Sequence, residues 1–333
     1  HLLVYIDTGF PRLIEIENKG GTVVETIVKE YEDRNSCGVA ETQEVFNDVF
    51  GNSLYKAESY GLIYWSHGEG WIPTPLPSTR WIGNDKTGGG HYMNIEDLKL
   101  VLQNAPHFDF IMFDACFMMS IEVAYAVRNY ADYYMGCPTE NPGPGAPYNK
   151  VVPYMFKQGA AVQMAEAYFG HYNENYNSGI GMSNTDWTGG TAVAVLKTSE
   201  LDNLAAVTNE ILQAGGATPK ELRTEVYDYD KRTAYNGHVG YFDIQEMMQH
   251  LMDDADYGLW KHAFNSALVY WKTTEKNYSM FADYRFDTVF GMFPMENTNG
   301  VTHYIPFNFD SQTAAAYRST DWYIAAGLDK IGW

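Results

Sequence analysis

The sequence predicts an α/β fold, with a mainly parallel sheet flanked by helices and a mostly helical C-terminal extension. Two segments, 60–65 and 108–116, are apolar and aromatic-rich, as in strands that helices cover on both faces. Strand and helix patterns alternate up to residue 198, which is typical of a parallel sheet. From residue 199 the pattern turns mostly helical. We therefore expect a core over 1–198 and, over 199–333, an extension that returns strands to the fold.

The individual elements are predicted from periodicity and from the residues that flank each pattern. Strands are expected at 2–6, 13–16, 60–65, 108–116, 133–137, 191–196, 288–293 and 301–305. Helices are expected at 22–31, 40–50, 201–212 and 242–252, with further ones starting at 95 and following residue 116. Asn94 precedes its helix as an N-cap. These elements bury a large core in a chain of 333 residues.

Composition excludes several classes of function. The net charge of −20 argues against nucleic acid and anionic lipid as partners and favours the approach of cationic substrates. No run of about 18 apolar residues is present, so we expect no membrane span. The three cysteines Cys37, Cys116 and Cys137 form neither a disulfide framework nor zinc-ligand spacing. The chain begins with His1 and enters a strand at once, which indicates a piece of a longer precursor.

Two of the predicted strands end in residues that carry chemistry. Cys116 is at the carboxyl end of the strand at 108–116, and His67 follows the strand at 60–65. Open α/β sheets place their ligands at the carboxyl ends of strands, where an imidazole and a thiol together form a nucleophile and its proton carrier. Gly68 allows a sharp turn, and its N–H can face a developing oxyanion. The alternative for Cys116 alone is a small buried core residue.

These segments resemble a known family. The run Trp65-Ser66-His67-Gly68-Glu69-Gly70-Trp71, followed by Asp114-Ala115-Cys116, is similar to the clostripain family of cysteine peptidases, which belongs to the group with a caspase-like fold. The resemblance is clearest from residue 1 to about 200. It implies a His67/Cys116 dyad without a third member, and bacterial export. It also implies an Asp- and Asn-rich turn after the first strand, where this chain has Thr8-Gly9-Phe10-Pro11-Arg12.

Two carboxylates are candidates for binding the substrate side chain before the cut bond. Strand alternation puts Asp114 on the same face as Cys116, and the resemblance implies that this aspartate sets a preference for Arg or Lys. The alternative is a structural aspartate that accepts bonds from backbone N–H groups. Glu140, after the third central strand, is the second candidate, with a solvated loop residue as its alternative.

The segment 72–92, expected as one long loop, carries two further expectations. It contains Arg80, which we expect to be a processing site because the resembled family is often cleaved between its two catalytic segments; the alternative is an ordinary loop arginine. Asp85 and Asp186 lie in Gly- and Asn-containing loops. Calcium dependence is known in parts of the family, but no dense acidic loop pattern occurs, so we expect turn chemistry and no metal or other cofactor.

We therefore expect a secreted or cell-surface cysteine endopeptidase that cleaves peptides and proteins after Arg or Lys. One alternative is another amide hydrolase or a transpeptidase that uses the same dyad. A second is a non-catalytic surface-binding protein, suggested by an aromatic share of 15% that includes 26 Tyr and 8 Trp.

Overall fold

The fold is built around one five-stranded sheet. It is seen in a computed structural model that describes residues 1–72, 82–86, 90–213, 217–233, 237–282 and 289–333. The strand order is β11-β9-β8-β7-β4. The bounds are β4 Gly61–Trp65, β7 Phe108–Asp114, β8 Ala131–Gly136, β9 Ala192–Lys197 and β11 Leu268–Thr273. β4, β7 and β8 are parallel, whereas β9 and β11 run antiparallel to their neighbours.

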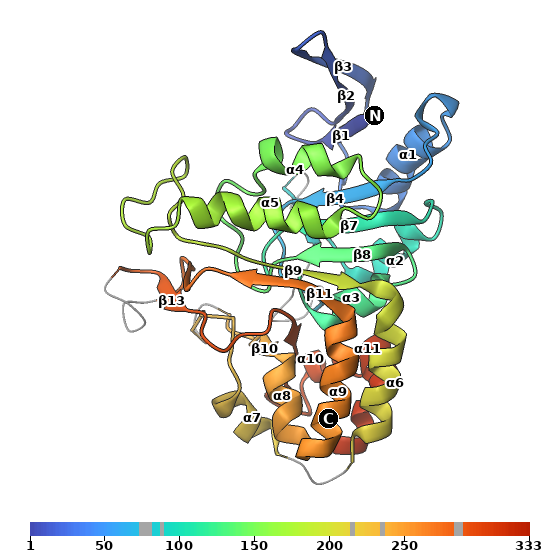
Figure 1. Ribbon diagram of the computed structural model, residues 1–333. Helices are drawn as coiled ribbons and strands as arrows, with labels where there is room; N and C mark the ends of the chain where they lie inside the picture. Colours follow the sequence, from blue (N-terminus) through green and yellow to red (C-terminus); the bar gives the residue numbers. More distant parts are fainter. Residues whose placement is uncertain (73–81, 87–89, 214–216, 234–236, 283–288) are drawn as a thin grey trace.

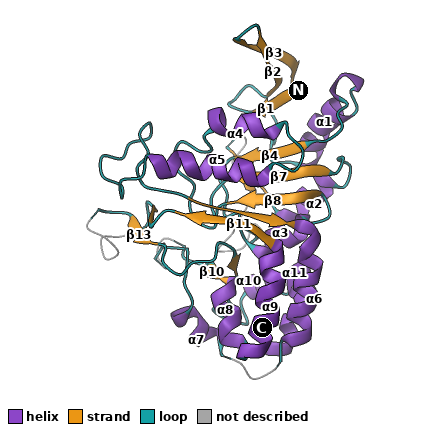
Figure 2. Ribbon diagram, in the orientation of Figure 1, coloured by secondary structure: helices purple, strands orange, loops and turns teal. Residues whose placement is uncertain are grey.

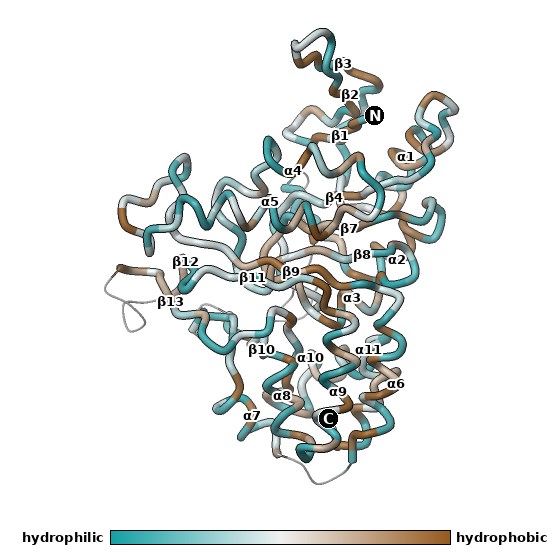
Figure 3. Tube along the Cα trace, viewed as in Figure 1, coloured by the Kyte–Doolittle hydropathy of each residue, from teal (hydrophilic) through white to brown (hydrophobic). Residues whose placement is uncertain are grey.

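Helices cover both faces of this sheet (Figure 1). β7 is buried along its whole length, and its side chains alternate between two cores. Ile111 and Phe113 pack into the larger core, with helices α2 Ile95–Leu102 and α3 Ile121–Val127. Phe110 and Met112 pack into the smaller one, with α5 Ala161–Glu174. Hydrophobic residues accordingly gather along the central strands (Figure 3).

The extension is mostly helical and forms the lower part of the molecule in Figure 2. Its α helices are α6 Leu201–Ile211, α7 Pro219–Glu225, α8 Ile244–Leu251, α9 Asp254–Ala267, α10 Gln312–Tyr317 and α11 Asp321–Ala326. Its strands besides β11 are β10 Phe242–Asp243, β12 Lys276–Tyr278, β13 Met292–Pro294 and β14 Thr302–His303. Because β11 pairs with β9, the extension completes the central sheet.

The N-terminal segment forms a separate antiparallel sheet of β1 Leu2–Ile6, β2 Arg12–Lys19 and β3 Thr22–Glu30. The predicted helix over 22–31 was therefore wrong. Gly20 and Gly21 both have positive φ, 64° and 90°, and connect Lys19 directly to Thr22 in a two-residue hairpin. The β-branched residues that follow favour a strand over a helix.

Other elements of the core are α1 Val39–Phe50, β5 Ile82–Asp85, β6 His91–Met93 and α4 Tyr148–Met155. They only partly match the expectation, because the segment 72–92, expected as one long loop, contains β5 and the start of β6, and neither α4 nor α5 was predicted. Asn94 does cap α2, in a capping box with Asp97. Within the described part of the chain, no helix has the length and apolar character needed to cross a membrane.

Candidate active site

The register of β4 and β7 brings the two predicted catalytic loops to one edge of the sheet. Trp65 pairs with Asp114, so His67 and Cys116 each lie two residues beyond a paired position. The loops also touch. A Cβ built on Gly68 would lie 2.7 Å from the Cβ of Ala115 and 2.8 Å from the carbonyl oxygen of Cys116. Only glycine allows the His67 loop to approach the Cys116 backbone this closely.

Cys116 is partly buried at this edge, and its sulfur already has one hydrogen-bond donor. The backbone N–H of Asn141 donates to Sγ at 3.3 Å. Burial, together with a smaller effect of the nearby carboxylate of Glu140, raises the pKa of the Cys116 thiol to about 12. The thiol therefore needs a proton acceptor or a neighbouring cation to become a nucleophile at neutral pH.

His67 is an exposed residue in the loop after β4, whose other residues are buried or partly buried. Its carbonyl oxygen accepts a hydrogen bond from Gly83 N at 3.0 Å, which ties this loop to β5. An exposed imidazole is accessible both to solvent and to a substrate. Its loop lies against the Cys116 backbone, so the structure brings together the two elements that carry the predicted dyad.

Asp114 is only 3% exposed and accepts hydrogen bonds at both oxygens. Asn141 Nδ2 donates to Oδ1 at 2.8 Å, while Ala146 N and Tyr148 Oη donate to Oδ2 at 2.8 and 3.0 Å. Burial raises the pKa of this carboxyl above its ordinary value. The backbone donors expected of a structural aspartate are thus present. A binding role requires an additional donor from a ligand.

One acceptor beside Asp114 has no donor. Asn141 Oδ1 is buried and has no hydrogen-bond partner within the described residues. Gly145, with φ of 76°, keeps the neighbouring space open, because a Cβ there would lie 3.0 Å from both Asp114 Oδ2 and Trp65 Nε1. The Trp65 ring is largely exposed. A carboxylate, an orphan carbonyl oxygen and an indole therefore lie within one small region next to Cys116.

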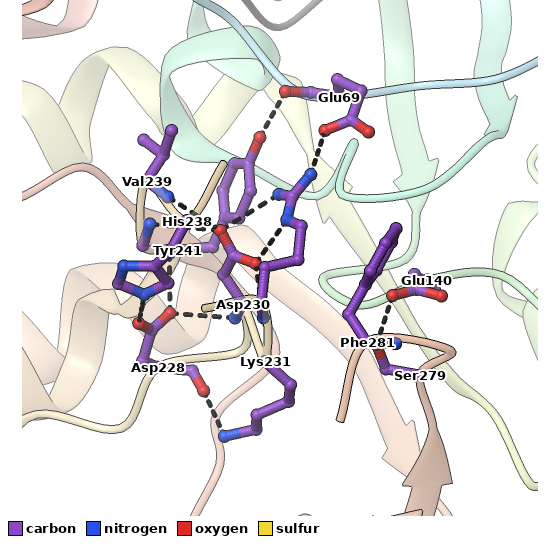
Figure 4. Close-up of polar contacts among 12 residues, drawn as sticks. Glu69, Glu140, Asp228, Asp230, Lys231, His238, Val239, Tyr241, Ser279 and Phe281 are labelled. Atoms are coloured by element: carbon purple, nitrogen blue, oxygen red, sulfur yellow. Dashed lines mark hydrogen bonds and ion pairs between the residues drawn. The ribbon is translucent and has the colours of Figure 1, made fainter. Parts of the chain in front are cut away.

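Glu140 faces the extension. Ser279 Oγ donates to Oε1, and Met280 N donates to Oε2 at 3.3 Å; Figure 4 shows this contact. Burial raises the pKa of Glu140 above its ordinary value. The solvated alternative predicted for this residue does not describe it, since the carboxyl is held between the core and the 279–281 segment.

A polar network connects the extension to the His67 loop, and it was not predicted from the sequence. Arg232 Nη1 donates to Glu69 Oε2 at 2.6 Å, and Tyr241 Oη donates to the Glu69 carbonyl oxygen. Figure 4 shows Glu69 above the 228–241 segment, with Asp230 at the centre of the network. The available signal was the charged run Asp228-Tyr229-Asp230-Lys231-Arg232 inside an otherwise helical pattern.

The other predicted residues lie elsewhere or in a different role. Arg80 falls outside the described residues. Cys37 is a buried residue in the turn before α1, and Cys137 is a buried core thiol near Tyr168. Asp85 Oδ2 accepts from Ser36 N at 2.8 Å, and the backbone of Asp186 is in a tight turn with Ser183. Among the described residues, no group of three or more His, Cys, Asp and Glu side chains could hold a metal ion.

Many aromatic residues in the described part of the chain lie in the cores and not on the surface. The largest fully buried side chains are mostly aromatic and belong to the cores: Trp260, Trp322, Tyr134, Tyr168, Tyr172, Tyr229, Tyr317, Phe108, Phe113, Phe242, Phe264 and Phe293. The high aromatic content therefore reflects packing.

This fold and sequence have relatives. A secreted C11 cysteine protease from Bacteroides thetaiotaomicron, solved with an irreversible peptide inhibitor, is 40% identical, covers 99% of this chain and 89% of its own, and has a TM-score of 0.88. A B. fragilis cysteine protease is also 40% identical, over 76% of this chain and 99% of its own, with a TM-score of 0.67. An inactive zymogen C11 protease from Parabacteroides distasonis is 27% identical, over 97% and 86%, with a TM-score of 0.80.

No curated protein matches the chain. The model of the clostripain family, however, matches residues 1–322. Together with the solved relatives, this match confirms the caspase-like fold and rules against a non-catalytic binding protein. The chain therefore belongs to the clostripain family and is a cysteine peptidase.

Proposed function

We propose that the protein is an endopeptidase that cleaves after Arg or Lys, with Cys116 as nucleophile and His67 as its acid–base partner. His67 takes the thiol proton, and the sulfur attacks the scissile carbonyl carbon. The N–H groups of Gly68 and Cys116 stabilise the oxyanion. His67 then gives its proton to the leaving amine, and water releases the acyl group from the sulfur. This chemistry needs no metal or other cofactor.

The observation that carries the basic-residue preference is the orphan acceptor Asn141 Oδ1 beside the buried carboxylate of Asp114. A buried acceptor without a donor costs free energy, and a guanidinium or ammonium group supplies N–H donors for it. The same positive charge offsets the cost of a buried carboxylate. The exposed indole of Trp65 is available for the apolar stem of an Arg or Lys side chain.

A positional-scanning peptide library tests this proposal. Wild type should cleave much faster after Arg and Lys than after any other residue, and Cys116→Ala and His67→Ala should lose activity by about 10⁴-fold or more. An arginyl acyloxymethyl ketone should label Cys116 and fail to label Cys116→Ala. Cleavage that persists in Cys116→Ala overturns the dyad, and transfer of the acyl group to an added amine in preference to water would favour a transpeptidase.

Asp114→Asn tests the pocket separately. Loss of the charge opposite a bound cation should lower kcat/KM for arginyl and lysyl substrates by about a hundredfold. Asp132→Asn is the matched control, because Asp132 is an exposed aspartate at the amino end of β8, the opposite edge of the sheet. Equal kcat/KM for Asp114→Asn and wild type would mean that Asp114 does not bind the substrate side chain and has only a structural role.

Two further parts of the proposal concern maturation and location. We place the protein outside the cytoplasm, because its B. thetaiotaomicron relative is described as secreted. Cleavage after Arg80 should yield two fragments of the active protein by mass spectrometry, and Arg80→Ala should abolish them. An intact chain in fully active protein would contradict processing at Arg80.

A further inference from the structure

Arg232 of the extension lies at the centre of a buried ion-pair network. It is 7% exposed, and its guanidinium donates through Nε and Nη2 to the two carboxylate oxygens of Asp230, at 2.6 and 3.0 Å. This bidentate contact fixes the plane of the guanidinium. Nη1 is then directed to Glu69 Oε2 at 2.6 Å. Glu69 lies only two residues after His67. The extension therefore contacts the His67 loop through the Glu69 side chain.

The same guanidinium also contacts the Cys116 loop. It lies 4.8 Å from the ring centroid of Phe117, the residue after Cys116. Phe117 has φ of 58°, a conformation that bulky residues rarely adopt and that the surroundings must hold in place. On its ring stacks Tyr241, with centroids 4.8 Å apart and planes 9° apart. Tyr241 in turn donates to the Glu69 carbonyl oxygen.

These contacts have a common geometry. Arg232 and Tyr241, both from the 228–241 segment, each touch the loop of His67 and the loop of Cys116. The strand register brings the loops to one edge, but neither Glu69 nor Phe117 lies in a strand. Their positions relative to each other depend on the side chains that bridge them.

We propose that Arg232 is a positioning residue for the peptidase reaction, which sets the His67 loop against the Cys116 loop through Glu69 and Phe117. This inference rests on the proposed His67/Cys116 dyad. It assigns to the extension a part in catalysis beyond completing the sheet. The alternative is that the network only stabilises the fold, and the two roles differ in how kcat responds when the protein stays folded.

The test measures kcat and KM on an arginyl peptide substrate for Arg232→Met, Glu69→Gln and the double variant. A displaced loop should lower kcat of Arg232→Met by about a hundredfold, with KM changed by less than about twofold. Glu69→Gln keeps a neutral acceptor, so about a tenfold loss is expected. Because both act through one contact, the double variant should be no slower than Arg232→Met.

Arg318→Met is the matched control. Arg318 is a partly buried arginine of the same extension that donates to the backbone oxygens of Trp333 and Phe309. It should keep wild-type kcat even if its Tm falls, with all assays run well below each variant's Tm. If Arg232→Met does not fold, Glu69→Gln decides, since it leaves the pair of Arg232 and Asp230 intact.

Wild-type kcat in folded Arg232→Met or Glu69→Gln, or kcat losses that multiply in the double variant, would overturn the positioning role. So would an equal kcat loss in Arg318→Met, which would indicate a general effect of destabilising the extension. Cys116→Ala and His67→Ala are assayed beside these variants. Activity in those two would refute the dyad itself, whereas their inactivity beside a fully active Arg232→Met refutes only the positioning role.

Discussion

The loops after β4 and β7 are positioned by strand register, whereas the 228–241 segment that contacts them is positioned by charged side chains. In the core, Trp65 pairs with Asp114 within a sheet whose strand β7 is buried throughout. In the extension, Arg232 forms ion pairs with Asp230 of its own segment and with Glu69 of the His67 loop, and the second pair connects the extension to the core. Backbone pairing resists single substitutions, but a buried ion pair is lost when either partner is replaced.

This difference separates two kinds of variant. Substitutions at the contact between the two core loops should displace the dyad directly. Substitutions at the contact with the extension should act more weakly, because the sheet still brings both loops to the same edge.

Outside the dyad, the largest loss of activity is expected for Gly68→Ala, at the contact between the His67 and Cys116 loops. The new Cβ would lie 2.7 Å from the Cβ of Ala115 and 2.8 Å from the Cys116 oxygen, so one of the loops must move. We expect kcat/KM to fall by about a thousandfold, which is more than the loss of about a hundredfold in kcat expected for Arg232→Met, because the Gly68 N–H is also a proposed oxyanion donor. Gly170→Ala, in α5 with no atom within 4 Å of its new Cβ, is the control and should keep full activity. An active Gly68→Ala would show that the loops tolerate separation.

A smaller effect is expected for Gly70→Ala, two residues further along the same loop. There the Cβ would meet the Tyr241 ring at 2.9 Å, and φ of 80° adds backbone strain. We expect about a tenfold fall in kcat/KM, because the clash is with the extension and not with the Cys116 loop. Gly258→Ala, in α9 with open space, is its control. If Gly70→Ala lost more kcat/KM than Gly68→Ala, the contact with the extension would matter more for activity than the contact between the two core loops.

The core half of the site was predictable from sequence because its signals are local. The buried strand before Cys116, the glycine-rich loop after His67 and the cap at Asn94 all appear as short patterns. Parallel strands then bring the two loops together without further information. Local signals failed at 22–31, where a helix was predicted and the Gly20-Gly21 hairpin produces β3, and in the segment 72–92, where a loop was predicted and β5 pairs with β6.

The extension half was not predictable, since Arg232 and Glu69 are 163 positions apart and pair only in the folded chain. Nothing local distinguishes Arg232 from a solvated arginine in a charged run. The orphan oxygen of Asn141 was likewise invisible, because burial and hydrogen-bond partners emerge only from the packed structure. The long-range polar contacts of this site could therefore be identified only in the folded structure.

The two candidate pocket carboxylates, Asp114 and Glu140, should differ in how strongly they affect the pH dependence of substrate preference. Burial raises the pKa of Asp114 and of Glu140, so each carboxyl takes up a proton at a higher pH than an exposed one. A protonated carboxyl cannot attract a cation. The ratio of kcat/KM for an arginyl substrate to that for a glutaminyl one should therefore fall on acidification, starting above pH 3.8, the ordinary value for aspartate.

The ratio is used because titration of the dyad affects both substrates alike and cancels. Asp114→Asn should remove most of the pH dependence of this ratio. Glu140→Gln should remove less, because Ser279 and Met280 already bind that carboxyl. A ratio that stays constant with pH in wild type would argue against a carboxylate in the pocket.

The smallest change in activity is expected for Glu122→Gln, where α3 of the core meets the extension. Glu122 is 2% exposed, accepts from Ser120 Oγ at 2.6 Å and from Tyr304 N at 2.8 Å, and burial raises its pKa from 4.5 to about 7. Between these values the folded state binds a proton that the unfolded state does not, so the carboxyl's contribution to stability falls as pH rises from 4.5 to 7.

The shift corresponds to a loss of at most about 3 kcal/mol in the free energy of unfolding above pH 7. Glutamine accepts from Tyr304 N through Oε1 and donates through Nε2 to Ser120 Oγ, and it does not titrate. Urea unfolding should therefore show Glu122→Gln gaining on wild type between pH 4.5 and 8, with kcat unchanged at every pH. Parallel pH–stability curves for the two proteins would mean that Glu122 is ionised in the folded state, and the boundary between core and extension would then contain a buried charge.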